Sequence, residues 1–517
     1  MRISTRRLHA PNAFASAMHA GRSIALLVLV ATLGASAATG ASAADVQLIQ
    51  AVKNGDAIAV RDLLGREADV NARQGDGATP LHWAAHLNDL EAADLLIRAG
   101  AAVDAANDLG VTPLWVATTT GSAAMVAKLL AARADPDIAP ETGGTPLMIA
   151  ARQGNVAALR SLLGHGADVN AREGAQGQTA LMWAVARQRP EVVRVLLEAG
   201  ADLHARTKSS RRHVLLCCQK SLGKTEGAVW IEQGGFTPLL FAARHGDAAS
   251  AELLVAAGAP VDDTAAAGTT PLVVAAQHGF HEVAAALLEM GADPDAAGAG
   301  QAALHWAALR GDREMAEILL AHGADPDVRL TRGSFLKHDR GAFAFDKFLI
   351  GATPFVLAAR RSDTEILRLL EAGGADTSLP LQDGRTAVMV AAGGENTGLR
   401  RLRIAEGQIL ETVRTALDLG VDANAASLSG DTALHVAANS KFDNVIRLLA
   451  ERGAFVNARN RMGQTPLAVA LAPPEAPDGS AIGGAALGRY REVYAAWVTS
   501  RGQTPTANLL RSLGGTE

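Results

Sequence analysis

The sequence predicts an all-α solenoid of about twelve helix-turn-helix units, and two observations support this fold class. A seven-residue pattern beginning with Thr-Pro-Leu returns along the chain, and its undisturbed steps are 32 to 34 residues long. Hydrophobic residues make up 49% of the 517 residues, whereas aromatic residues make up 4%. A core built mainly from alanine, leucine and valine suits thin helices that pack closely, as they do in stacked repeats.

Residues 1–43 form the first expected element, an export signal. Basic residues precede an apolar run and then a small-residue stretch, in the order Arg2, Arg6, Arg7, Arg22, Ile24–Leu33 and Ala41-Ser42-Ala43. The apolar run has ten residues, whereas a membrane-spanning helix needs about 20. We therefore expect cleavage near Ala43 or Ala44 and no stable membrane insertion afterwards. The alternatives are an uncleaved anchor and a translation start at Met18.

The repeated pattern organises residues 44–514 into one expected stack of units. Its copies begin at Thr79, Thr112, Thr145, Thr179, Thr237, Thr270, Ala302, Thr353, Thr386, Thr432 and Thr465. The Thr79 hydroxyl is expected to accept a backbone hydrogen bond at the start of the first helix, and Pro80 begins that helix where no amide donor is needed. The second helix of this unit ends at Gly100, because glycine tolerates the left-handed conformation of a helix end.

The period and the signature TPLHWAA resemble the ankyrin repeat, over nearly everything from about Asp45 to Gly514. The resemblance implies that the chain binds other proteins through its first helices and hairpin fingers. The unit that begins at Asp45 lacks the Thr-Pro-Leu-His start and is expected to cap the stack at its N-terminal end. The segment from Ala507 is expected to be the second helix of the last unit, followed by a short tail at residues 515–517.

Three steps between copies exceed the usual length, by 25, 18 and 13 residues. Together with a Pro- and Gly-rich segment near the C-terminus they give four expected insertions, 1 to 4, at about residues 207–234, 330–350, 394–408 and 472–505. Insertions 1 and 2 fall where a hairpin finger joins one unit to the next, and insertions 3 and 4 fall between the two helices of one unit. Insertions on one face of a repeat stack often belong to its binding face.

Insertion 1 includes the stretch SRRHVLLCCQKSLGKTEGAVW, with the chain's only two cysteines, Cys217 and Cys218. A phosphate-binding loop would need a glycine where Cys218 stands, five residues before Gly223. A zinc site would need cysteines two residues apart and a second pair, and adjacent cysteines lie too close for an ordinary disulfide. The apolar segments on either side of SLGKTEG instead favour an elongated two-stranded finger, with no metal or cofactor.

Aromatic residues in the insertions are candidate partner contacts. Insertion 2 mixes basic residues with phenylalanines, which a solvated linker would not need. These phenylalanines either pack on the solenoid or form a contact surface for a partner. The candidate contact residues in the two insertions are Trp230, Phe343, Phe345 and Phe348.

Basic residues also recur just beyond the small-residue pair near the end of each first helix. Stacking of the repeats should bring them into a row along the concave side of the solenoid. Cations at helix C-termini also favour the helix dipole, by about 0.3 to 1 kcal/mol each, and this explanation can hold together with partner binding. The residues of this predicted basic row are Arg152, Arg187, Arg244, His245, His278, Arg310, Arg360 and Arg361.

These observations predict an exported protein-binding scaffold or regulator rather than an enzyme. In a bacterial cell the export signal implies a periplasmic or secreted protein. The net charge of −5 and the isoelectric point near 6.3 give no electrostatic case for nucleic acid, whereas the basic row would favour a protein partner with an acidic surface. Two alternatives stay open: an accessory or redox-active partner of an exported enzyme that uses Cys217 and Cys218, and a secreted effector that binds a host protein.

Overall fold

The computed structural model describes residues 43–141, 143–215, 228–332, 349–393, 404–472 and 503–517. Within these ranges it contains 24 helices and one two-stranded sheet, which confirms the predicted helical solenoid class. The chain divides into two compact units, unit 1 (residues 1–205) and unit 2 (residues 206–517). No helix in the described ranges combines the length and the apolar character that crossing a membrane requires.

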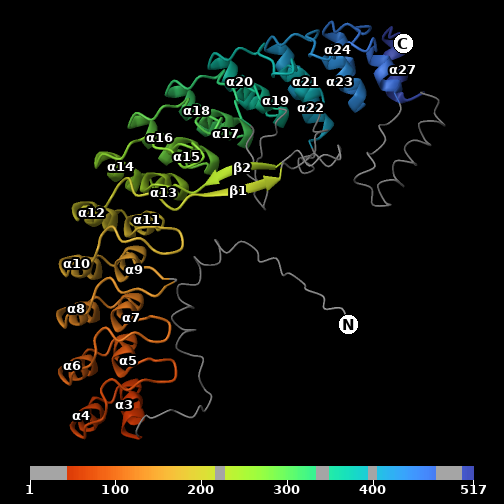
Figure 1. The fold of residues 1–517 in the computed structure, drawn as a ribbon. Coiled ribbons are helices and arrows are strands. Elements are labelled where there is room, and N and C mark those ends of the chain that lie inside the picture. The colour runs from red at the N-terminus through yellow and green to blue at the C-terminus, as the bar shows by residue number, and fades with distance from the viewer. Residues whose placement is uncertain (1–42, 142, 216–227, 333–348, 394–403, 473–502) are drawn as a thin grey trace, which may run out of the picture. The chain divides into compact units, whose positions relative to one another are not determined.

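Unit 1 consists of helix pairs that follow the sequence repeat. Its helices are α3 (Ala43–Lys53), α4 (Ala57–Gly65), α5 (Pro80–Leu87), α6 (Leu90–Arg98), α7 (Pro113–Thr120), α8 (Ala123–Ala131), α9 (Pro146–Gln153), α10 (Val156–Gly164), α11 (Ala180–Val185) and α12 (Pro190–Glu198). The first helices of the pairs contact one another in one row, and the second helices form a second row beside it (Figure 1). The pattern leucines Leu81, Leu114, Leu147 and Leu181 are all 0% exposed between these rows.

Unit 2 has a two-row architecture of the same kind and contains the sheet. Its helices are α13 (Pro238–His245), α14 (Ala248–Ala256), α15 (Pro271–His278), α16 (His281–Glu289), α17 (Ala303–Arg310), α18 (Arg313–Ala321), α19 (Pro354–Arg361), α20 (Thr364–Ala372), α21 (Ala387–Ala392), α22 (Glu406–Asp418), α23 (Ala433–Ser440), α24 (Asp443–Glu451), α25 (Pro466–Leu471) and α27 (Pro505–Ser512). The odd-numbered helices from α13 to α25 pack in one row, and the even-numbered helices and α27 pack in the other (Figure 1).

The inserted segments are described in part. Strands β1 (Ser210–Leu215) and β2 (Ala228–Gln233) of insertion 1 pair antiparallel, with Ser210 opposite Gln233 and Leu215 opposite Ala228. The expected interval of insertion 3 ran to residue 408, but α22 already begins at Glu406. This helix is 13 residues long, longer than the other second helices, and therefore takes up the end of the interval. The phenylalanine candidates Phe343, Phe345 and Phe348 lie outside the described residues, as do Cys217 and Cys218.

Threonine caps most first helices, as the sequence predicts. The threonine hydroxyl accepts the amide hydrogen of the residue three positions later at Thr112, Thr145, Thr179, Thr237, Thr270, Thr353, Thr386 and Thr465. The prediction is wrong at Thr79, where His82 takes over this end of the helix. His82 Nδ1 accepts the Thr79 amide hydrogen at 3.1 Å and lies 2.9 Å from the Thr79 hydroxyl oxygen.

The histidine at this position also joins neighbouring repeats. With Nδ1 acting as an acceptor, the ring donates from Nε2, and His82 Nε2 lies 2.9 Å from the Val111 carbonyl oxygen of the next repeat. His305 and His435 make the equivalent contacts, to Ala352 at 3.3 Å and to Gln464 at 3.0 Å. Each of these buried rings therefore satisfies one backbone donor in its own repeat and one backbone acceptor in the next repeat.

A second link between repeats follows the second helices. In the loop after a second helix, an Asp or Asn side chain accepts the backbone amide hydrogen of a residue that stands two positions earlier in the corresponding loop of the next repeat. Examples are Asp137 with Asp168 at 3.1 Å and Asn170 with Asp202 at 2.7 Å in unit 1, and Asp295 with Asp325 at 2.8 Å in unit 2. This side chain therefore links the loops of consecutive repeats.

Candidate functional site

In unit 1, two arginines of the predicted basic row lie close together beside a tryptophan. Arg152 lies in the last turn of α9, and its guanidinium carbon is 5.1 Å from the centre of the Trp183 ring in α11. Burial, and then the positive charge of Arg187, lower the pKa of Arg152 from its ordinary value. Within the described residues, Arg152 forms no ion pair with a carboxylate. Arg152, Trp183 and Arg187 therefore form a cationic aromatic surface, named here the α9–α11 surface.

A related arrangement in unit 1 was missed from the sequence. The Lys53 amino nitrogen lies 4.1 Å from the centre of the Trp83 ring and donates to Gln74 Oε1 at 2.7 Å. His86 meets the same ring edge-on, with the ring centres 5.9 Å apart. The signal that could have indicated this contact is the tryptophan shared by TPLHWAA and TALMWAV, which follows the pattern's first residue by four positions.

In unit 2, Arg244 also lies over an aromatic ring. Its guanidinium carbon is 5.5 Å from the centre of the Phe236 ring, and Phe236 meets Phe241 at 6.0 Å. His245 stacks on Phe241 at 6.0 Å with an interplanar angle of 14°. Arg244 is exposed, and within the described part of the chain no carboxylate pairs with it. We name Arg244, His245 and the two rings the α13 surface.

Other members of the predicted row hold repeats together. Arg310 Nη1 donates to the Gln277 carbonyl oxygen of the preceding first helix at 3.0 Å, and Arg310 Nε lies 3.8 Å from Asp312 Oδ2. Gln153 and Ser440, at the same repeat position, make equivalent bonds to Thr119 and Gly393 at 2.8 and 3.1 Å. This position therefore supplies a side chain that reaches back to the end of the previous helix.

Arg361 and His278 share that repeat position. A methyl group placed on Gly311 of the preceding repeat would lie 3.6 Å from Arg361 Nη2, so Arg361 lies against that repeat. His278 Nδ1 lies 2.9 Å from the Val274 carbonyl oxygen, and its ring stacks on Phe280 at 5.8 Å. Arg360 precedes Arg361 in the last turn of α19. The predicted row thus includes two arginines over aromatic rings, Arg152 and Arg244, and two that contact the preceding repeat, Arg310 and Arg361.

The insertion residues are placed only in part. Trp230 lies in β2 opposite His213 in β1, which fixes its register in the sheet. Among the residues whose side chains are described, no group of three His, Cys, Asp or Glu side chains is arranged to hold a metal ion.

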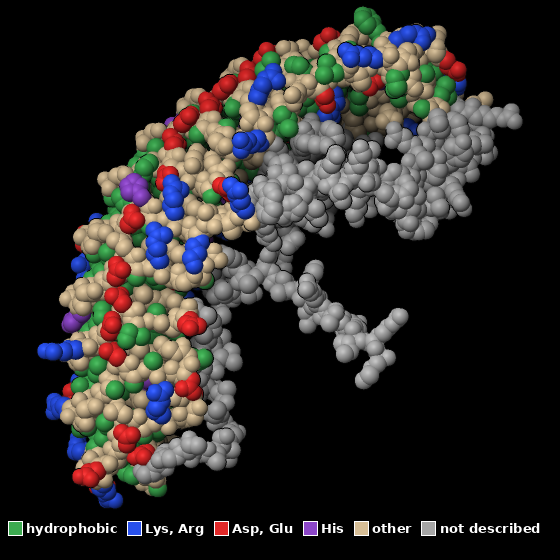
Figure 2. Space-filling model, in the orientation of Figure 1, with side chains coloured by type: hydrophobic (Ala, Val, Ile, Leu, Met, Phe, Trp, Pro, Cys, Tyr) green, Lys and Arg blue, Asp and Glu red, His purple; other side chains and the backbone are tan. Residues whose placement is uncertain are grey.

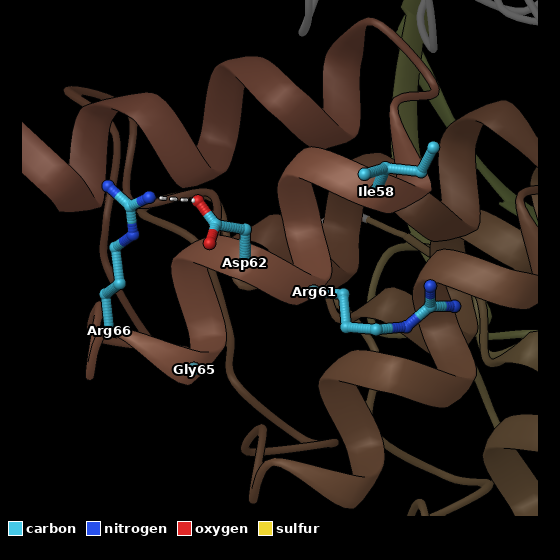
Figure 3. A pocket seen from close by; sticks show the side chains of 5 residues that line it. All are labelled: Ile58, Arg61, Asp62, Gly65 and Arg66. Carbon is cyan, nitrogen blue, oxygen red and sulfur yellow. Dashed lines mark ion pairs between the residues drawn. The ribbon is translucent and has the colours of Figure 1, made fainter.

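The surface hollows lie elsewhere. One shallow hollow on α4 is lined by Ile58, Arg61, Asp62, Gly65 and Arg66, and Arg66 pairs with Asp62 at 2.8 Å (Figure 3). Ile58 is 77% exposed. Acidic and basic side chains are interspersed over the visible face of each unit (Figure 2), so no single charge dominates the coloured residues there. The hollow on α4 comes from one helix and shares no residue with the surface around Arg152.

Comparison with known proteins gives short local similarities. The chain is 38% identical over 74 residues to serine/threonine-protein kinase 12 of Arabidopsis thaliana, covering 14% of this chain and 16% of the kinase. It is 47% identical over 62 residues to protein PhlB of Serratia liquefaciens, covering 12% of this chain and 27% of that protein. It is 34% identical over 128 residues to ankyrin repeat and SOCS box protein 16 of Mus musculus, covering 24% of this chain and 27% of that protein. The chain thus spans 27% or less of each relative.

A solved structure and a family model cover larger parts of the chain. The ankyrin repeat domain of human ASB11 is 26% identical, with a TM-score of 0.38, and the match covers 48% of this chain and 98% of that domain. A family model described as ankyrin repeats in three copies matches residues 48–139, 124–207, 214–298, 239–329 and 402–473. Because these matches cover more than half of the sequence, the chain belongs to the ankyrin-repeat family, whose repeats form protein–protein interaction scaffolds.

Proposed function

We propose that the chain is an exported scaffold or regulator that binds an acidic protein partner through its first helices and insertions. The observation that carries the proposal is the position of Arg152, which lies over Trp183 and beside Arg187. Two like charges repel each other, and burial adds a cost for the Arg152 charge. A partner carboxylate beside the Arg152 guanidinium would offset both costs, so this surface favours an acidic segment.

The α13 surface supports the same chemistry in unit 2. The Phe236 ring lies beneath the Arg244 guanidinium at 5.5 Å, and a cation over an aromatic face is stabilised there without a carboxylate. The planar fork of an arginine still has its N–H groups available to a partner carboxylate in this geometry. The partly exposed Phe236 ring would add apolar contact area, which is typical of the central residues of protein interfaces.

Insertions 1 and 2 are proposed to extend the contact area. Strands β1 and β2 form a hairpin at the hairpin-finger position of the repeat, and its residues include Trp230. Phe343, Phe345 and Phe348 belong to the same proposal through insertion 2, although they lie outside the described residues. Aromatic side chains supply much of the binding energy in protein interfaces.

Export is proposed from the order of charge, apolar run and small residues before Ala44. Mass spectrometry of the mature N-terminus tests this step, with cleavage near Ala43 or Ala44 as the expected result. Retention of residues 1–43 in the exported or fractionated protein would contradict it.

The binding proposal is tested by quantitative capture from a periplasmic extract with the mature chain as bait. The captured partner is then titrated against Arg152→Ala and Arg244→Ala. Each variant should weaken binding by about 5-fold to 30-fold, in keeping with about 1 to 2 kcal/mol for an interface anchor. The loss should shrink as salt concentration rises, because salt screens exposed charges.

The matched control is Arg160→Ala, which removes an exposed arginine from a second helix, α10. This variant should bind the partner like the parent. Circular dichroism of all three variants checks that the helices remain. If Arg152→Ala and Arg244→Ala are folded and bind as tightly as Arg160→Ala, the partner site lies elsewhere.

A further inference from the structure

One arginine position recurs at the start of the turns between repeats, and it is occupied at both large hairpin insertions. Arg459 shows its local contact in a turn without an insertion. Its Nη1 donates to the Gly463 carbonyl oxygen, four residues later, at 2.7 Å. Gly463 lies two residues before Thr465, the start of the next pattern copy. The arginine therefore closes the turn that leads into the next first helix.

The same closure persists where the turn is interrupted. Arg206 Nη1 donates to the Gly235 carbonyl oxygen, 29 residues later, at 3.1 Å, and Gly235 also lies two residues before a pattern copy. Arg329 Nη1 donates to the Gly351 carbonyl oxygen, 22 residues later, at 3.2 Å. The extra separations of 25 and 18 residues equal the lengths by which these two repeat steps exceed the usual period. The arginine thus joins the two ends of each insertion.

The same side chains also reach the following repeat. Arg73, in a turn without an insertion, donates to the Ala106 carbonyl oxygen of the next repeat at 3.1 Å. Arg206 donates to the equivalent carbonyl oxygen of Thr264 at 2.6 Å, and Arg329 to that of Pro380 at 3.0 Å. Arg206 also pairs with the neighbouring carboxylate of Asp263. Arg206 and Arg329 thus each stand at the start of an insertion, and their guanidinium groups contact the end of that insertion and the next repeat.

The backbone around Arg206 completes a closed base for insertion 1. The Thr207 amide donates to the Phe236 carbonyl oxygen at 3.0 Å, and the Phe236 amide donates to the Thr207 hydroxyl oxygen at 2.9 Å. Gly234 has a φ of 94°, and a Cβ there would lie 2.1 Å from the Lys208 carbonyl oxygen. Only glycine fits this close approach of the two chain ends.

We infer that Arg206 and Arg329 are positioning residues that fix the direction in which insertions 1 and 2 leave the repeat stack. Each holds the two ends of an insertion together and ties them to the repeat that follows. The inference rests on the proposed function, in which these insertions contact the partner. A fixed exit direction would let an insertion and the adjoining repeat meet one partner without an added ordering cost on binding.

The test measures the direction of insertion 1 in the full chain by pulsed electron paramagnetic resonance. Cys217→Ser and Cys218→Ser remove the native thiols, and spin labels are attached through Ser210→Cys in β1 and Glu252→Cys in α14, both exposed positions within unit 2. The parent should give one narrow distance peak. Arg206→Ala should lose this peak in favour of a broad distribution, while circular dichroism stays unchanged.

Arg73→Ala is the matched control, because it removes the same repeat contact from a turn without an insertion. It should leave the distance peak narrow. Arg206→Lys serves as a second variant if Arg206→Ala fails to fold, and it should also broaden the peak because an ammonium group lacks the planar fork. A narrow peak in a folded Arg206→Ala or Arg206→Lys variant would overturn the inference.

Partner titration separates this inference from the proposed function. If Arg206→Ala broadens the distance distribution and weakens partner binding, both stand. If it broadens the distribution and binding is unchanged, the positioning role stands and the proposal that insertion 1 contacts the partner is wrong.

Discussion

Acid should weaken unit 2 through His305, and the structure gives the size of the effect. His305 is 0% exposed in α17, and its burial lowers its pKa from 6.5 to about 4. Its hydrogen bonds to the backbone of Ala352, Val328 and Ala302 oppose this shift but do not overcome it. The neutral ring is therefore the form that fits the fold.

The direction of the pH dependence follows from proton binding. Between pH 6.5 and about 4 the unfolded chain binds a proton at His305 that the folded chain does not. The stabilisation is therefore fully present above pH 6.5 and is lost progressively as the pH falls towards 4. A pKa difference of this size corresponds to about 3 kcal/mol of unfolding free energy.

The perturbation that isolates this effect is His305→Gln. Glutamine has an acceptor and a donor for the Ala302 amide and the Ala352 carbonyl oxygen, which bond the ring at 3.0 and 3.3 Å, but it does not titrate. Native-state hydrogen exchange of the α17 amides, corrected for the intrinsic effect of pH, reports the local opening free energy. In the parent this free energy should fall by up to about 3 kcal/mol between pH 7 and 4, and in His305→Gln it should fall by clearly less.

The matched control is His322→Gln, at an exposed position after α18 in the same repeat. It removes a histidine without changing the interior of α17. If His305→Gln and the parent show the same pH dependence in α17, burial of His305 does not determine the acid sensitivity.

Three further predictions concern the stability of the repeats. Burial raises the pKa of Asp137, Asp262 and Asp295, so their charged forms cost stability that is regained as the pH falls towards 3.8. Asparagine at the same repeat position donates an additional bond, as from Asn170 to Gly200 at 3.2 Å and from Asn424 to Gly453 at 3.0 Å. Each Asp→Asn variant should therefore gain about 1 kcal/mol at pH 7 and less at pH 4, and lower melting temperatures at pH 7 would contradict this. Gln188, Ser362 and Lys441 have φ values of 55°, 59° and 60° at helix ends where other repeats use glycine. Replacement by glycine should stabilise each site by about 0.5 to 1 kcal/mol, and replacement by alanine should not, in denaturant titrations. Deleting residues 505–517 removes α27, whose Ala507 and Leu510 are 0% exposed, and should lower the melting temperature and solubility. Unchanged unfolding would show that α27 does not cap the stack.

The helical framework could be predicted from the sequence because its determinants are local. Thr145 and Pro146 begin α9, and Gly154 ends it in the left-handed conformation with a φ of 81°. All three signals lie within ten residues of one another, so a single repeat contains the information for its own first helix. The departure at Thr79 is also local in origin, since the His82 ring lies only three residues away, accepts the Thr79 amide hydrogen and lies 2.9 Å from the Thr79 hydroxyl oxygen.

The division of the predicted basic row could not be predicted in the same way, because it depends on the neighbouring repeat. Successive residues of an α-helix point about 100° apart. Arg152 is seven residues beyond the first residue of its pattern copy and meets Trp183, whereas Arg310 is eight beyond and reaches back to Gln277. An alignment on the small-residue pair groups these two arginines together, although one residue of offset directs them to different neighbours.

Because of this offset, truncating Arg310 and truncating Arg244 should have different consequences for the fold. Truncating Arg310 removes a charge-assisted bond to the last turn of α15 and leaves the Gln277 carbonyl without that donor, so its main cost falls on the contact between two repeats. Truncating Arg244 removes a cation from the Phe236 ring at an exposed position, so the repeats keep their hydrogen bonds. In an array whose stability depends on each interface between neighbours, only the first change should propagate along the stack. The residue seven positions beyond the pattern's first residue therefore lies over an aromatic ring at Arg152 and Arg244, whereas the residue eight positions beyond reaches back to the preceding repeat at Gln153, Arg310 and Ser440.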